Sequence, residues 1–444
     1  MSAKPYMTSD SLVESVTRRI SFPLSQNTLQ YNDILAMASE ELMLNAVPQI
    51  MQEHAEYFIF KVMVPIVSGI SRYEIPYRTM GMALRDLEYS DASGNFFKMT
   101  RTAPEDRAFW QLNVGSNQAI AKYYLEGNEV VLTPEIVNSP TGFLNFFVYL
   151  RPNQLVRNDR AAVIESFVKE ISIDDNSAFV AGDTITITTG VQTPSPVITV
   201  LTAVAGSPTS SQFQIGANAN ATAQNLCNAL DALGIEGVGC TVVSNVVTVS
   251  YDDLSTTFDY TTSGSPVSID NNNILISFDN LASTYTDVDT DETTDLYTVG
   301  SKVDFLQTNP GHRTYNYDVK IRDIPSSNVA EFRADDLKAY LNNGSGGQKQ
   351  FLSIKVGDYI CLANECIIPQ IPPELHNALA ERTASRVLMS IGDREGLAIS
   401  QQKIAEMDQK QASLIGSRVE GSVPKVFNSR SLLRLNKRTG RRRV

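Results

Sequence analysis

The sequence of 444 residues is poor in the residue types that most often carry catalysis, metal binding or disulfide bonds. It has three histidines, four cysteines and one tryptophan. Four scattered cysteines provide no disulfide framework, so reduced thiols are expected. His54, His312 and His376 fall in three different segments, and a structural role is expected for each. A reaction centred on histidine or cysteine is therefore disfavoured.

The sequence also lacks a long hydrophobic run and a signal peptide. Its most apolar stretch, Tyr57–Ile70, is interrupted by Lys61 and Pro65 and is too short to span a bilayer. Residues 1–20 lack the basic and apolar regions of a secretory leader. We expect a soluble protein made in a reducing cytoplasm.

Three short patterns resemble ligand-binding motifs, and each departs from its template. Asp287, Asp289 and Asp291 alternate as in a calcium loop, but the sixth and twelfth positions are Glu292 and Thr298. A solvated acidic linker is expected there.

The other two patterns concern zinc and phosphate. Cys361 and Cys366 have no second Cys or His pair to complete a zinc site. The glycine-rich loop Asn342–Gly347 with Lys349 lacks the spacing of a phosphate-binding loop. We therefore expect no metal, no cofactor and no enzymatic activity. A hydrolase that uses paired carboxylates is the least favoured alternative.

Charge is distributed unevenly along the chain. The net charge is −12, which argues against general nucleic-acid binding. From Arg418 onward there are nine basic residues and one acidic residue, so this arm carries +8 and the rest −20. Apolar residues are interspersed among the basic ones, and such a segment becomes ordered on a partner. A protein partner is favoured over nucleic acid, because phosphate binding does not require apolar side chains.

Helical periodicity marks both ends of the chain, and strand patterns fill the middle. The fold class expected is α+β: a helical bundle formed from the N- and C-terminal segments, with a large β-rich insertion that contains a further inserted β domain, and an extended basic C-terminal arm. The expected boundaries are 1–70 for the N-terminal helices, 71–170 and 296–371 for the two parts of the β-rich domain, 171–295 for the inserted β domain, 372–416 for the C-terminal helices and 417–444 for the arm.

Five helices are expected at the two ends. They run from Ser9 or Asp10 to Ile20, from Asn32 or Asp33 to Pro48, over Gln49–Val64, over Pro373–Ile391 with Gly392 just beyond its end, and from Arg394 onward. The last helix carries a narrow apolar seam suited to a bundle or a subunit contact, made of Leu397, Ile404, Met407 and Leu414.

The middle of the chain changes composition at about Ile171. Residues 171–295 are poor in Lys and Arg and rich in Thr, Ser, Asn, Asp and Val. Ala181–Thr188 and Val242–Tyr251 alternate with the period of a strand, and Ala221–Leu233 reads as a helix. This composition indicates a separate β-rich domain.

Several stretches together resemble a known family. They are Asn32–Leu42, Tyr73–Pro76, Leu87–Gly94, the helix Pro373–Ile391 with Gly392 and Asp393, and Arg418–Lys425. With the helical ends, the β insertion and the arm, the chain resembles the head-to-tail adaptor (connector) proteins of tailed bacteriophages. The similar stretches cover about a third of the chain, and the segment 171–295 departs from the small members of the family.

The resemblance implies a structural virion protein of the neck, made in the host bacterial cytoplasm. It implies a homo-oligomeric ring, typically of twelve copies, that docks below the portal protein and extends the channel for genomic DNA without sequence-specific binding. The β region would face a downstream tail or nozzle protein, or tail fibres. The arm would dock on the portal through Arg418, Lys425, Val426, Phe427, Arg430, Leu432, Leu433, Arg434, Leu435, Lys437 and Arg438.

One alternative of a different class is a tail or surface protein that binds a receptor or glycan through the inserted β domain. It predicts that residues 171–295 bind a ligand when isolated. Against it, the sequence shows no internal repeats and no aromatic clustering of the kind expected of a glycan platform.

Overall fold

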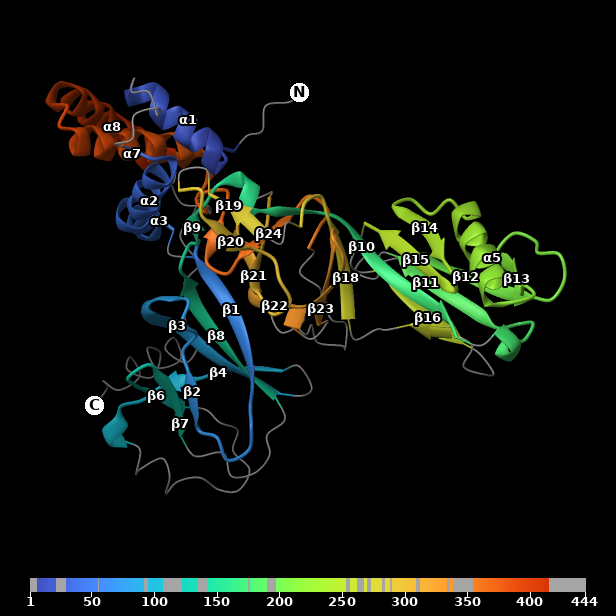
Figure 1. The fold of residues 1–444 in the computed structure, drawn as a ribbon. Coiled ribbons are helices and arrows are strands. Elements are labelled where there is room, and N and C mark those ends of the chain that lie inside the picture. The colour runs from blue at the N-terminus through green and yellow to red at the C-terminus, as the bar shows by residue number, and fades with distance from the viewer. Residues whose placement is uncertain are drawn as a thin grey trace, which may run out of the picture.

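The computed structural model describes residues 6–20, 29–54, 56–91, 95–106, 122–133, 142–174, 176–189, 197–252, 256–261, 267–269, 273–281, 284–287, 290–308, 312–333, 336–337 and 354–414. Within them the chain is a mixed α+β protein with a β-rich body, as predicted. The helices of the two chain ends gather in one layer, and strands extend from this layer in two directions (Figure 1).

The helical layer joins segments from both ends of the chain. Helix α7 contacts α1, α2 and α8, and these helices share one apolar core. No helix in the described ranges is long and apolar enough to cross a membrane. The helices of the protein are α1 Ser9–Ile20, α2 Tyr31–Glu41, a π-helical turn Leu42–Ala46, α3 Val47–Glu53, α5 Ala219–Ala232, α7 His376–Ile391 and α8 Arg394–Leu414.

The predicted third helix over Gln49–Val64 is wrong in its second half. Helix α3 ends at Glu53, and Ile59–Pro65 forms strand β1, which pairs antiparallel with β8 (Gly142–Leu150). The apolar run here is rich in aromatic and β-branched residues, which favour strands. Periodicity does not distinguish a short apolar helix from a buried strand, and strand pairing decides the outcome.

A first β body, built from two four-stranded sheets, lies below the helices (Figure 1). Leu87, Val130, Leu144 and Phe146 are fully buried in its core. Strands β6 and β7 form a hairpin, and Gly127 in its two-residue turn has the positive φ (60°) that such a turn requires. The sheets are β1-β8-β3-β4 and β2-β7-β6-β5, with β2 Arg72–Glu74, β3 Thr79–Asp91, β4 Phe96–Lys98, β5 Thr100–Arg101, β6 Lys122–Glu126 and β7 Glu129–Thr133.

A nine-stranded sheet forms the centre of the protein. Its order is β14-β15-β10-β18-β23-β22-β21-β24, with β17 also beside β10. The strands are β10 Ala162–Ile173, β14 Val238–Val243, β15 Val246–Tyr251, β17 Val267–Ile269, β18 Asn273–Phe278, β21 Lys302–Leu306, β22 Thr314–Ser326, β23 Val329–Arg333 and β24 Tyr359–Leu362. A small parallel pair joins β9 Gln154–Leu155 to β25 Glu365–Cys366.

Strand β10 connects this sheet to an outer lobe, which we define as residues 171–269. The start of β10 pairs with β24 and its end with β15 and β17. Figure 1 shows β10 leading from the centre into the lobe. A second sheet completes the lobe in the order β13-β12-β11-β16, with β11 Thr184–Thr189, β12 Val197–Val204, β13 Gln212–Gln214 and β16 Thr257–Thr261.

The lobe and the central sheet share one apolar core. Ile185 and Leu201 of the second sheet belong to the same buried cluster as Val247 and Phe305 of the nine-stranded sheet. Strand β18, which lies inside the predicted inserted domain 171–295, pairs with β10 and β23 of the central sheet. The predicted domain boundaries stay predictions.

The acidic stretch from Asp287, predicted as a solvated linker, is instead followed by a strand that belongs to a hairpin. Strand β20 (Thr293–Asp295) pairs antiparallel with β19 (Thr284–Thr286), and the β-branched threonines in both strands suit such a pair. Asn32 of α2 donates from Nδ2 to Oδ2 of Asp287 at 2.6 Å. The hairpin is therefore tied to the helical layer.

The expectation of four reduced thiols is wrong for one pair. A disulfide joins Cys227 of α5 to Cys240 of β14, with the two Cα atoms 5.6 Å apart. Helix α5 packs on β14, and this tertiary contact, which the spacing does not reveal, brings the two residues together. Cys361 and Cys366 are free and buried.

Candidate functional site

Two of the three histidines lie together, although the sequence placed them in separate segments. The ring centroids of His312 and His376 are 5.8 Å apart, and both residues are buried. His376 Nδ1 accepts a hydrogen bond from the Met7 N–H at 3.0 Å. Its Nε2 therefore carries the proton and faces the Ile371 carbonyl at 3.2 Å. Burial, and then the neighbouring His312, lower the pKa of His376 to about 4.

This histidine pair holds the start of the described chain against α7. The ring of Tyr6 meets the His312 ring edge-on at 4.9 Å between centroids. Burial also lowers the pKa of His312, whose Nδ1 has no hydrogen-bond partner among the described residues. His54 lies apart from the pair, at the end of α3. Two buried, neutral rings suit packing better than proton exchange with a substrate.

The free cysteines Cys361 and Cys366 do not gather with other described His, Cys, Asp or Glu residues into a group suited to a metal ion. Burial raises the pKa of both the Cys361 and the Cys366 thiols, and protonated thiols are poor ligands. Across the described ranges, no group of three or more His, Cys, Asp or Glu side chains is suited to holding a metal ion.

A buried ionic cluster joins the first β body to the central sheet. Arg78, just before β3, donates to both carboxylate oxygens of Asp304 on β21 at 3.2 and 2.9 Å. Asp304 also accepts from Asn153 Nδ2 at 2.7 Å and from the backbone N–H groups of Asp318 and Asn364, each at 3.0 Å. Arg78 is 2% exposed and Asp304 0%. The cluster therefore connects the two bodies through buried, charge-assisted hydrogen bonds.

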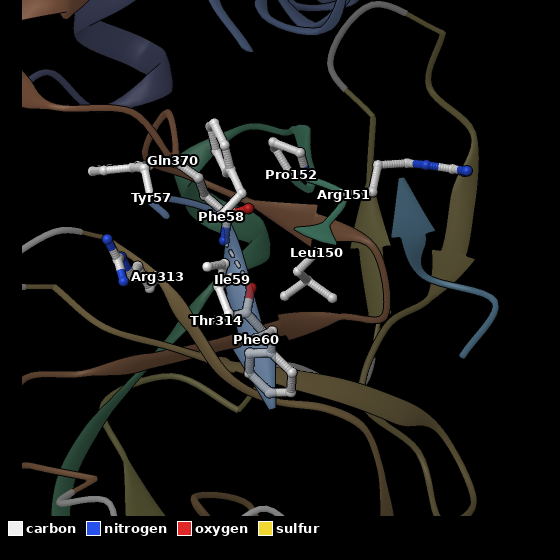
Figure 2. Close-up of a pocket in the computed structure, with 10 residues that line it drawn as sticks. All are labelled: Tyr57, Phe58, Ile59, Phe60, Leu150, Arg151, Pro152, Arg313, Thr314 and Gln370. Carbon is white, nitrogen blue, oxygen red and sulfur yellow. Dashed lines mark hydrogen bonds between the residues drawn. The ribbon is translucent and has the colours of Figure 1, made fainter. Parts of the chain in front are cut away.

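A small pocket lies close to this cluster. Figure 2 shows its lining, which comes from the start of β1, the end of β8, the start of β22 and Gln370, with Arg151 pointing away from the other side chains. The Arg313 guanidinium lies over the Tyr57 ring at 4.5 Å, and Gln370 Nε2 donates to Thr314 Oγ1 at 2.8 Å. The cavity volume is about 40 Å³. Small-molecule sites usually enclose about 300–1,000 Å³, so this pocket is too small for such a ligand.

A larger hollow lies in the helical layer, between α2 with its π-helical turn, α7 and α8. Its volume is about 250 Å³. Of the predicted contact residues, Leu397 and Ile404 line it, Met407 is half-buried, and the side chain of Leu414 lies outside the described residues. The lining consists of Glu41, Asn45, Arg382, Ser385, Arg386, Met389, Leu397, Gln401 and Ile404.

Ion pairs fix the walls of this hollow. Arg386 of α7 pairs with Glu40 and Glu41 of α2, and Arg382 Nη2 lies 2.8 Å from Asp408 Oδ1 of α8. Met389, at the edge of the hollow, is 70% exposed. Sequence reasoning missed Met389, although Ser385, Met389 and the arginines follow helical spacing on one face of α7.

The predicted portal-docking residues, from Arg418 to Arg438, lie outside the described residues, as does the glycine-rich loop Asn342–Gly347. The docking role of the arm therefore stays a prediction. Helix α8 is the last element before the arm in the sequence.

The chain was compared with protein families, with curated proteins and with solved structures. No protein-family model and no curated protein matches the chain. Among solved structures, one described as Mycobacterium phage Patience aligns with 61% of this chain and 96% of its own, at 8% identity and a TM-score of 0.15. At that TM-score the alignment carries no argument about fold or mechanism.

Proposed function

We propose that this chain is a structural head-to-tail adaptor whose helical layer forms a ring and whose basic arm docks on a portal protein. The observation that carries the proposal is the packing of helices from both chain ends around α7. The β bodies thus project from a compact helical base, and the +8 arm follows α8 directly in the sequence.

The hollow beside α8 is the proposed subunit contact. A heterologous interface closes into a ring when one surface accepts a different surface of the next copy. The hollow offers apolar walls from Leu397, Ile404 and Met389, with the charges of its arginines already paired. A side chain of the neighbouring copy therefore enters without leaving a charge unpaired.

The arm adds affinity on assembly. Its apolar residues supply burial and its basic residues supply attraction to an acidic portal surface. Repetition around a ring multiplies a weak single contact, because later contacts form within one assembly. The negative charge of the rest of the chain suits a channel that DNA passes without sticking, since like-charged walls repel phosphates.

The mass of the purified protein, alone and mixed with its candidate portal protein, tests the arm. The full chain is expected to join the portal as a large defined ring, and a chain ending at Gly416 is expected not to join it. If both chains join equally, or if neither does, the arm assignment is wrong.

A variant whose larger side chain fills the hollow tests the subunit contact separately. Ser385→Trp is expected to prevent ring formation while the far-UV circular dichroism of the monomer is unchanged. Gln402→Trp, on the exposed side of α8, is the matched control and should still form rings. Rings formed by the Ser385 variant would show that the hollow is not the contact.

A further inference from the structure

The outer lobe has an unusual charge. From residue 171 to residue 269 the sequence contains eight acidic residues and no lysine or arginine. The acidic residues are Asp174, Asp175, Asp183, Asp231, Glu236, Asp252, Asp253 and Asp259. The lobe therefore has a net charge of −8, which attracts basic partners and repels acidic ones.

One strand of this lobe has an open edge. Strand β12 pairs with β11 along one side from Val197 to Thr202. On its other side, β13 pairs only with Thr202–Val204. Among the described residues, no strand pairs with that side of Val197–Leu201.

The direction of the main chain shows which groups this edge presents. Thr202 donates its N–H to the Ser211 carbonyl, and Val204 accepts from Ile215, both on the β13 side. Main-chain groups alternate along a strand, so the N–H and C=O groups of Ile198 and Val200 point to the same side. They form a template for an added strand.

The side chains at this edge are apolar and exposed. Val197 and Ile198 are each 62% exposed, and Val200 is 40% exposed. On the outward face, Ile198 and Val200 lie beside Thr188 and Thr186 of β11, and the acidic Asp259 of β16 lies on the far side of Thr186. Natural proteins protect such edges with lysine, proline or bulges, and this segment of β12 has none of these. An unprotected edge of this kind serves for pairing.

We propose that the Val197–Leu201 edge of β12 binds an extended segment of a partner protein as an added strand, and that lysines or arginines flank this segment in the partner. Added strands gain affinity from main-chain hydrogen bonds and specificity from alternate side chains. The negative charge of the lobe favours a partner segment with lysines or arginines on either side. A second copy of this chain is disfavoured, because two lobes of −8 repel each other. This inference does not depend on the adaptor proposal.

The test uses two synthetic ten-residue peptides with the same apolar centre, one flanked by lysines and one by glutamates. Binding to the full-length protein is measured by fluorescence anisotropy at low and high salt. The lysine-flanked peptide is expected to bind at least tenfold more tightly at low salt, and the difference should shrink at high salt because exposed charges are screened. Equal binding of the two peptides, or binding of neither, overturns the proposal.

Variants locate the site. Val200→Pro removes one edge N–H and is tolerated at an open edge, so it should weaken binding at least tenfold without unfolding the lobe. Ile198→Lys, a second edge variant, should do the same. Val243→Lys changes a 71% exposed valine on β14 and should leave binding unchanged. Binding that survives both edge variants, or wild-type self-association that Ile198→Lys abolishes, overturns the proposal in favour of another site or a second copy.

Discussion

Replacing Asp304 by asparagine should destabilise the protein strongly, because it removes the charge that compensates buried Arg78. The variant keeps the shape of the side chain but places an amide opposite the N–H donors of Asn153, Asp318 and Asn364. Breaking a buried ion pair on one side costs about 3–5 kcal/mol. Arg78 retains Asn153 Oδ1 and lies 3.7 Å from Asp318, so the lower end, about 3 kcal/mol, is expected.

The opposite replacement should cost less. In Arg78→Met, Asp304 keeps three N–H donors and remains solvated by protein groups. Urea unfolding followed by circular dichroism measures both variants, and the double variant gives the coupling energy. Arg72→Met is the control, since Arg72 makes exposed ion pairs and little change is expected. If Asp304→Asn is no less stable than the Arg72 variant, the cluster does not hold the two bodies together.

Three further predictions concern the lobe and the helical layer. Reduction of the disulfide between Cys227 and Cys240, which closes a short loop, should lower the stability of the lobe by about 3 kcal/mol in thermal melts with and without reductant. Because the folded pKa of His376 is lowered from 6.5 to about 4, stability should be complete above pH 6.5 and fall as the pH drops toward 4; His376→Asn should flatten that slope in urea titrations. Gly392→Ala should cost about 1–2 kcal/mol, since φ is 84° with open space around it, whereas Gly206→Ala should not.

The outcomes that would contradict these three predictions are distinct. Unchanged melting under reductant would show that the disulfide does not constrain the lobe. Parallel pH curves for the wild type and His376→Asn would show that this ring does not titrate with folding. A stability of Gly392→Ala equal to that of Gly206→Ala would show that the left-handed conformation is not required.

Local chemistry made several elements predictable. Helix α1 ends at Ile20 as predicted. Gly392 lies just beyond the end of α7 in a left-handed conformation, as expected for a glycine that follows the last residue of a helix. The α+β class followed from the same kind of signal. These features depend on residues that are neighbours in the sequence, so the sequence alone is enough to predict them.

Features that depend on distant contacts were not predictable. Strand β1 is decided by its pairing with β8, about eighty residues later, and not by the pattern of Ile59–Pro65 itself. The Arg78–Asp304 pair and the contact between His312 and His376 likewise join segments that nothing in the spacing links. The hollow was half predicted: the seam named Leu397 and Ile404, but the opposite wall comes from α2 and α7.

Strand β10 has a mechanical consequence. One continuous strand of 12 residues belongs to both the central sheet and the outer lobe. A pull on the lobe along this strand acts at right angles to its antiparallel hydrogen bonds, so all of them resist together instead of opening one by one. A load taken up by the lobe would thus reach the centre of the protein through a shear connection, without a flexible linker to absorb it.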